Sequence, residues 1–269
     1  LEFRRVLFRS GSGDLTGLLV PAEERVKAQV IVREDAVLCG APWFDAVMQA
    51  CDASIIVDWQ YAEGDLMRAD SVVCRIEAPA RALLTAERSA LNFLQLLSGV
   101  ATKTRHYAVL TEGTRAAVLD TRKTLPGLRL AQKYAVRVGG GKNQRLALYD
   151  GILIKNNHIT AAGGVRQALE RTRDTHLRVE IEVRTLEELD EALQCGAQHL
   201  LLDNLTPGEA HVWVQRVAGR ATTELSGGIT LGSIKAYAAS GADFISVGAL
   251  THSSPAADLN FRLSGPYTG

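Results

Sequence analysis

The sequence predicts an α/β protein in which an N-terminal α/β sandwich domain is followed by an incomplete, TIM-like α/β barrel. Two patterns favour this fold. Before Pro79, apolar and polar residues alternate with the period of two that is typical of strands. After Thr114, short apolar runs alternate with amphipathic helical segments, which is typical of a parallel sheet with buried strands. A chain of 269 residues is long enough for both parts.

The N-terminal part is expected to be a small unit of strands and helices. Its strand segments are VKAQVIVRE, SIIVDWQYAEGD and SVVCRIEAP, with a helix from Pro42 and a long helical stretch from Arg81 to Leu110. We assign residues 13–112 to this domain with its junction helix, 113–251 to the barrel, and 252–269 to a tail that packs back on the first domain. Residues 1–12 fit neither part and are interpreted as an expression scar without a fold of its own.

Six apolar runs are the expected barrel strands: AAVLD, GILIK, RVEIEV, HLLLDN, TTELSG and FISVG. Nearly every run carries a charged or special residue at or just past its end: Asp120, Lys155, Glu182, Asp203, Ser226 with Gly227, and Gly248. In a barrel, the carboxyl ends of the strands converge on one mouth, whereas in an open doubly wound sheet they line an edge. Periodicity does not choose between the two folds, and the strand ends favour the barrel.

The composition excludes several classes of protein. Lys plus Arg and Asp plus Glu number 30 each, so there is no broad basic field for nucleic acid or an anionic membrane. No apolar run reaches the roughly 18 to 20 residues of a membrane helix. The four cysteines lie far apart without a CxxC pair, which indicates reduced thiols in a cytoplasmic protein rather than a zinc or redox site.

A dense basic set is expected at the mouth of the barrel. Its members are Arg122, Lys123, Lys142, Arg145 and Lys155. Arginine binds carboxylates and phosphates through two parallel hydrogen bonds, and lysine acts as a point charge, so the set suits a ligand with several negative charges. The alternative is a solvated charged face, but Lys155 ends an apolar strand, where an unpaired ammonium group is costly.

Two carboxylates, Glu182 and Asp203, end apolar strands and are expected to face this basic mouth. They could bind a divalent metal ion or ribose hydroxyls and stabilise a cationic sugar. They could also be salt-bridge partners of the lysines, and Glu180 shares the strand face of Glu182, so spacing does not say which carboxylate acts. Glycines after the last two strands, in LSGGITLGS and SVGAL, are typical of a phosphate site in a barrel.

The strings DTRKTLPGLR, KYAVRVGGGKNQR, LIKNNHI, IEVRTLEELDEAL, LLLDN, ELSGGIT and ISVGALTH occur in this order. As a set they resemble the quinolinate phosphoribosyltransferases, also called carboxylating nicotinate-nucleotide pyrophosphorylases, from about Gly13 to Leu259. The resemblance implies transfer of phosphoribose from phosphoribosyl pyrophosphate to quinolinate with loss of carbon dioxide, in NAD biosynthesis. It also implies dependence on Mg²⁺ and a homodimer with shared active sites.

The resemblance further implies a role for individual residues. Arg122, Arg145 and Lys155, with Gln144 and with Arg88 from the partner subunit, would bind quinolinate. Lys123 would contact the phosphates of the sugar donor, and Thr121, two residues before it, would also bind substrate. Glu182 and Asp203 would hold ribose hydroxyls and, through water, the metal ion. The 5-phosphate would be held by Ser226, Gly227, Gly228, Val247, Gly248 and Ala249. The residues expected to carry catalysis are Lys123, Lys155, Glu182 and Asp203.

Two positions depart from the family pattern, which has a histidine where Gln144 stands and an acidic residue where Asn156 stands. Glutamine can still donate a hydrogen bond to a carboxylate, but it cannot titrate. Two other functions stay open at this point. One is a related transferase that accepts nicotinate or another anionic ring, and the other is a non-catalytic barrel that binds phosphosugars.

Overall fold

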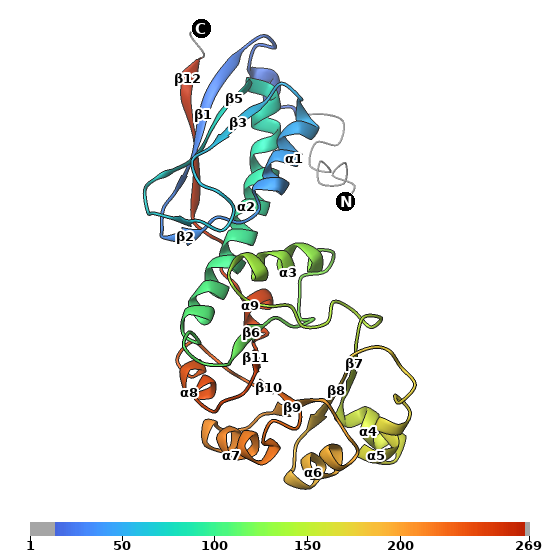
Figure 1. Ribbon diagram of the computed structural model, residues 1–269. Helices are drawn as coiled ribbons and strands as arrows, with labels where there is room; N and C mark the ends of the chain where they lie inside the picture. Colours follow the sequence, from blue (N-terminus) through green and yellow to red (C-terminus); the bar gives the residue numbers. More distant parts are fainter. Residues whose placement is uncertain (1–13, 267–269) are drawn as a thin grey trace. The chain divides into compact units, whose positions relative to one another are not determined.

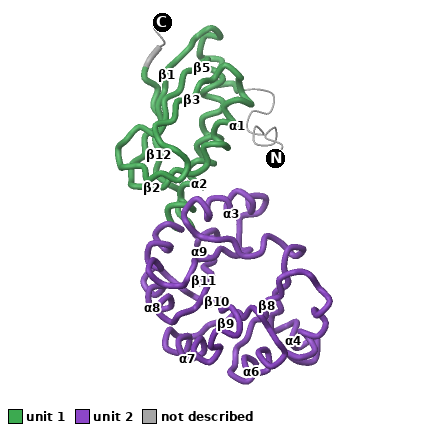
Figure 2. The backbone as a smooth tube through the Cα atoms, in the orientation of Figure 1, with its two compact units in different colours: residues 1–103, 254–269 green, residues 104–253 purple. Residues whose placement is uncertain are grey.

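The computed structural model describes residues 14–266, so the interpretation of residues 1–12 as an expression scar lies outside the described residues. The described residues form two compact units (Figure 2), one of residues 14–103 with 254–266 and one of Thr104–Ser253. Helix α2 (Ala80–Val109) contributes residues to both units, so the division falls inside this helix. Among the described residues, no helix is long and apolar enough to span a membrane.

The first unit is built on an antiparallel sheet with the strand order β12-β1-β5-β3 (Figure 1). The strands are β1 (Arg25–Val32), β3 (Ile56–Trp59), β5 (Val72–Pro79) and β12 (Leu259–Pro266). A small second sheet pairs β2 (Ala36–Val37) with β4 (Leu66–Met67). Strand β12 comes from the end of the chain and pairs with β1 from Val26 to Val32, so the two ends of the chain share one sheet.

Two helices supply the core of this unit. Helix α1 (Ala41–Cys51) begins with Pro42 in its first turn and buries Phe44, Val47 and Met48. Helix α2 buries a row of leucines at helical spacing, Leu83, Leu91, Leu94 and Leu97. A 3-10 turn (η2, Gly17–Leu19) precedes β1.

The second unit is a parallel sheet of six strands in the order β6-β11-β10-β9-β8-β7. The strands are β6 (Ala117–Leu119), β7 (Ile152–Ile154), β8 (Val179–Val183), β9 (His199–Asp203), β10 (Thr222–Ser226) and β11 (Phe244–Ser246). The first strand therefore pairs with the last one, and the sheet is open only between β6 and β7. This order requires a sheet that curls round on itself, and Figure 1 shows the strands along an arc.

Helices follow the strands along the chain. They are α3 (Arg129–Val138), α4 (Asn156–Ala162), α5 (Val165–Glu170), α6 (Leu186–Gln194), α7 (Pro207–Val217), α8 (Ile234–Ala238) and α9 (Ala249–His252). Of these, α6 and α7 lie on the outer side of the arc (Figure 1). Local sequence sets several helix starts. For example, Thr206 and Glu209 form a capping box at α7, with Pro207 in the first turn. The expected incomplete barrel is confirmed, and an open doubly wound sheet is excluded because the strand order contains no switch point.

Candidate functional site

A cavity of about 1020 Å³ opens at the carboxyl ends of the barrel strands. Side chains from the ends of all six strands contribute to its wall, which is the arrangement that a barrel imposes on its strand ends. The lining includes Thr121, Arg122, Lys123, Gln144, Arg145, Lys155, Glu182, Asp203, Ser226, Gly227, Gly228, Val247, Gly248 and Ala249. The structure thus brings together the predicted site residues of the barrel except Lys142, although these residues span more than half of its sequence.

One part of the wall is cationic and lacks acidic partners. Across residues 14–266, no carboxylate lies within ion-pair distance of Arg122, Lys123 or Arg145, whereas Lys155 and Arg184 are paired. Arg145 donates to the carbonyl of Gly151 at 3.1 Å, and its buried Nε has no partner in the described part of the chain. Burial first, and then the positive charge of Arg122, lower the pKa of Arg145. The more distant carboxylates of Asp150 and Glu180 oppose this shift. Because two like charges lie close together and neither is ion-paired within the described residues, this region favours binding of an anion.

A buried ion pair fixes the segment that carries Gln144 and Arg145. Asp120, fully buried at the end of β6, pairs with Lys133 of α3, which is 2% exposed. The carboxylate also accepts hydrogen bonds from Asn143 Nδ2 at 2.6 Å and from the backbone amide of Gln144 at 2.9 Å. Burial raises the pKa of Asp120, and these partners oppose that shift. The pair does not line the cavity, so Asp120 holds the wall of the site instead of facing the ligand.

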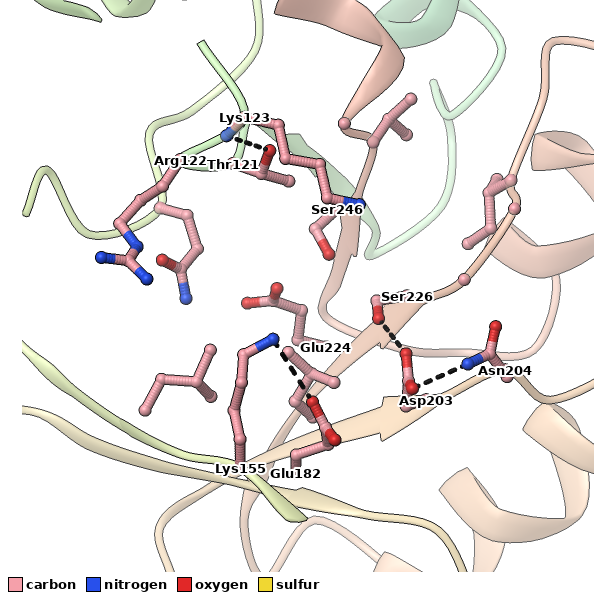
Figure 3. A pocket seen from close by; sticks show the side chains of 18 of the residues that line it. Thr121, Arg122, Lys123, Lys155, Glu182, Asp203, Asn204, Glu224, Ser226 and Ser246 are labelled. Atoms are coloured by element: carbon pink, nitrogen blue, oxygen red, sulfur yellow. Dashed lines mark hydrogen bonds and ion pairs between the residues drawn. The ribbon is translucent and has the colours of Figure 1, made fainter. Parts of the chain in front are cut away.

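The opposite part of the wall carries the two predicted carboxylates. Glu182 Oε2 lies 3.6 Å from Lys155 Nζ, and Glu182 Oε1 lies 3.0 Å from Arg184 Nη2. Asp203 accepts hydrogen bonds from Ser226 Oγ at 2.6 Å and from Asn204 Nδ2 at 2.7 Å (Figure 3). Both carboxylates are therefore held in fixed orientations at the rim of the cavity.

The glycine loop after β10 closely approaches the neighbouring strand end. Gly227 has a φ of +105°, and a Cβ there would lie 2.3 Å from Asn204 Oδ1 and 2.8 Å from Asn204 Cα. Only glycine fits this position, because any other residue would have a strained backbone and its side chain would overlap Asn204. At the neighbouring strand end, a Cβ on Gly248 would lie 3.1 Å from Lys123 Cδ. The absence of side chains leaves the backbone of both loops accessible to a phosphate.

Whether Glu180 or Glu182 faces the ligand is decided by how deep each residue lies in the barrel. Glu182 lines the cavity, whereas Glu180, one layer deeper in the barrel, does not and accepts a hydrogen bond from Gln144 Nε2 at 2.9 Å. Lys142, expected in the basic set, lies outside the lining, with its Nζ 5.9 Å from the ring centroid of Phe244. Arg88 lies on α2 in the first unit and is also outside this lining.

Several lining residues were missed at the sequence level: Arg129, Asn157, Arg184, Asn204, Glu224, Ser246 and His252. A signal existed for Glu224, because it precedes Ser226 by two residues and so faces the same side of its strand. Among residues 14–266, no three His, Cys, Asp or Glu side chains gather into a group that could hold a metal ion. Magnesium is often held by one or two carboxylates together with substrate phosphates, and Glu182 and Asp203 fit that kind of site.

Fold and site together define a barrel protein that binds a small polyanionic ligand at the carboxyl ends of its strands. The chain belongs to the quinolinate phosphoribosyl transferase family, whose C-terminal domain matches residues 100–262 and whose N-terminal domain matches residues 14–98.

Individual relatives agree with the family assignment. The chain is 41% identical to the nicotinate-nucleotide pyrophosphorylase [carboxylating] of Mycobacterium leprae, over 95% of this chain and 92% of the relative. It is 38% identical to a probable enzyme of the same name from Bacillus subtilis, over 94% of this chain and 89% of the relative. The solved structure of the Francisella tularensis nicotinate-nucleotide pyrophosphorylase is 39% identical and superposes with a TM-score of 0.93, over 97% of this chain and 94% of that one.

Proposed function

We propose that this chain transfers the phosphoribosyl group of phosphoribosyl pyrophosphate to quinolinate, with release of pyrophosphate and carbon dioxide, and so forms nicotinate mononucleotide for NAD biosynthesis. The observation that carries the proposal is the division of one cavity into a cationic wall without acidic partners and an acidic wall beside a glycine loop. Quinolinate carries two carboxylates and the sugar donor carries phosphates and hydroxyls, so the two walls match the two substrates.

The diacid is assigned to the cationic wall. Arg122 and Arg145 would each bind a carboxylate through the planar guanidinium group, with Gln144 and Lys155 beside them. Because Lys155 is already paired with Glu182, it lies where the diacid site and the sugar site meet. Holding the ring in a fixed orientation converts a bimolecular attack into an effectively unimolecular one.

The sugar donor is assigned to the other side of the cavity. Glu182 and Asp203 would bind the ribose hydroxyls, and Ser226, Gly227, Gly228, Val247, Gly248 and Ala249 would surround the 5-phosphate. Lys123, whose backbone amide donates to Thr121 Oγ1 at 3.1 Å, would contact the pyrophosphate. Bound magnesium, held by substrate oxygens and through water by the two carboxylates, would neutralise the leaving group.

The chemistry then follows from these positions. As the bond between the anomeric carbon and pyrophosphate lengthens, Glu182 and Asp203 stabilise the positive charge that develops on the sugar. The ring nitrogen of quinolinate attacks the anomeric carbon. When the bond to the 2-carboxylate breaks, its electron pair stays on C2, where the adjacent positive ring nitrogen stabilises it. Carbon dioxide therefore leaves without a protein base, and C2 then takes a proton.

We expect the purified protein, with magnesium and phosphoribosyl pyrophosphate, to convert quinolinate to nicotinate mononucleotide and to use nicotinate far more poorly. The reason is that nicotinate lacks one of the two carboxylates that the cationic wall would bind. Nucleotide formation, followed by chromatography with each acid in turn, measures the ratio. Equal use of both acids would contradict the diacid assignment, and binding of the sugar donor without any product would indicate a non-catalytic barrel.

The proposed assembly is a homodimer in which Arg88 of one subunit completes the site of the other. Arg88 is half exposed on α2, and its Nη2 lies 3.7 Å from Glu87 Oε1. A third arginine at the diacid, after Arg122 and Arg145, would add to the charge of the cationic wall. The proposed location is the cytoplasm, which the four free cysteines support.

Arg88→Ala and Lys123→Ala are each expected to be nearly inactive, whereas the two variants mixed and reassembled should recover activity. With random exchange of subunits, half of the dimers are mixed and each has one intact site, so activity should approach about a quarter of wild type. Each variant reassembled with itself is the control and should stay inactive. If mass spectrometry shows mixed dimers and no activity returns, Arg88 does not act on the neighbouring subunit.

A further inference from the structure

A third carboxyl group reaches into the cavity, and the chemistry described above does not use it. Glu224, on β10, is 2% exposed and lines the cavity. Figure 3 shows its carboxyl group in the middle of the site, with Arg122 on one side and Asp203 on the other. It therefore lies at the boundary between the cationic wall and the acidic wall.

Glu224 has a second glutamate as its neighbour. Glu180 lies within hydrogen-bonding reach of Glu224, and Glu180 Oε1 and Glu224 Oε2 are both buried without a donor among the described residues. Two neighbouring ionised carboxylates repel each other strongly, and oxygens that lack a hydrogen-bond donor are satisfied when one proton lies between them. The arrangement therefore indicates a carboxyl pair that shares a proton.

The surroundings place that proton on Glu224. Glu180 has two partners that Glu224 lacks, because its Oε2 accepts a hydrogen bond from Gln144 Nε2 at 2.9 Å and its Oε1 lies 3.6 Å from Arg178 Nη2. Burial, and next the negative charge of Glu180, raise the pKa of Glu224 to about 8, while Ser246 and Arg178 act in the opposite direction. The residues paired in register with Glu224 on β9 and β11 are Leu201 and Phe244, which carry no charge.

The reaction needs an acid at this boundary. It joins the ring nitrogen of the diacid to the anomeric carbon of the sugar, so the nitrogen and its neighbour C2 must lie between the two walls. When carbon dioxide leaves, the electron pair of the broken bond stays on C2, and C2 must gain a proton to give the product. A buried carboxylic acid that faces the reacting ring can supply it.

We propose, on the basis of the proposed function, that Glu224 is the acid that protonates C2 of the pyridine ring after decarboxylation. The bond from C2 to its carboxylate breaks and carbon dioxide departs. The C2 carbanion then takes the proton of the Glu224 carboxyl group, which leaves Glu224 as a carboxylate. Glu224 regains a proton from water once the product has left. Glu180 acts as a positioning residue, since its charge keeps the proton on Glu224 until C2 takes it.

The test separates glycosyl transfer from protonation in a single turnover, with pyrophosphate and nicotinate mononucleotide measured in the same quenched samples. In Glu224→Gln, we expect pyrophosphate release within about threefold of wild type and nucleotide formation slowed about 100-fold, the usual loss for a general acid. The ribosylated diacid should accumulate. If both steps slow equally or neither slows, the proposal is wrong. If wild type itself yields neither product, the proposed function fails instead.

The pH dependence gives an independent readout, which also serves if Glu224→Gln does not fold. In wild type, nucleotide formation should fall above about pH 8 while pyrophosphate release does not, because Glu224 loses its proton there. In Glu180→Gln, the neighbouring negative charge is gone, so the pKa of Glu224 drops and the fall should move to lower pH. Gln144 can still donate to the amide oxygen of the new side chain. An unchanged profile in Glu180→Gln overturns the proposal.

Discussion

Asp203→Ala is expected to lower turnover about 100-fold while leaving the binding of quinolinate largely intact. Asp203 lies on the acidic wall, where Ser226 and Asn204 fix its orientation, and it is assigned to the sugar donor. Losing a charge contact that is strongest in the transition state costs on the order of 3 kcal/mol, or about 100-fold in rate. Steady-state kinetics for turnover and calorimetric titration with quinolinate measure the two quantities separately.

Asp190→Ala is the matched control for this variant. Asp190 is also an aspartate paired with an arginine, Arg216, but it lies on α6 outside the cavity lining. Its removal should leave turnover unchanged. If Asp203→Ala keeps normal turnover and binds quinolinate weakly, the two walls have been assigned to the wrong substrates.

Lys133→Met is expected to lower the free energy of unfolding by about 3 to 5 kcal/mol, because it leaves the buried carboxylate of Asp120 without its counter-charge. Urea denaturation followed by circular dichroism measures the change. The variant should also lose activity, since Asp120 and Lys133 hold the segment that carries Gln144: Lys133 Nζ donates to the carbonyl of Gln144 at 2.9 Å.

Two further variants show whether burial of the Asp120 carboxylate causes the loss of stability. The double variant Asp120→Asn with Lys133→Met removes the uncompensated charge and should recover part of the lost stability. Arg115→Met breaks the ion pair with Asp243 in the same unit, but Arg115 is 71% exposed, so the loss should be below about 1 kcal/mol. Equal losses in Lys133→Met and Arg115→Met would show that desolvation of Asp120 is not the cause.

The sequence alone determined the elements of the barrel and the composition of its mouth. The six apolar runs are the six strands of the second unit, because buried parallel strands require continuous apolar residues. Lys155, Glu182 and Asp203 lie at or just past the ends of such runs, and parallel strands bring their carboxyl ends to one side of a sheet. These are local rules, so they can be applied without knowing how the strands pair.

The tertiary structure alone decided closure, depth and burial. Pairing of the first strand with the last joins segments more than 120 residues apart, and no local pattern records it. The period of two places Glu180 and Glu182 on one face, but only the packed barrel puts one in the cavity and the other beneath it. Likewise, the sequence places Asp120 at a strand end like the other site residues, but in the structure it is buried in an ion pair with Lys133 of α3. The alternation of side chains along a strand fixes which face of the sheet a residue points to. How deeply it is buried and which charges it pairs with depend on elements distant in the sequence.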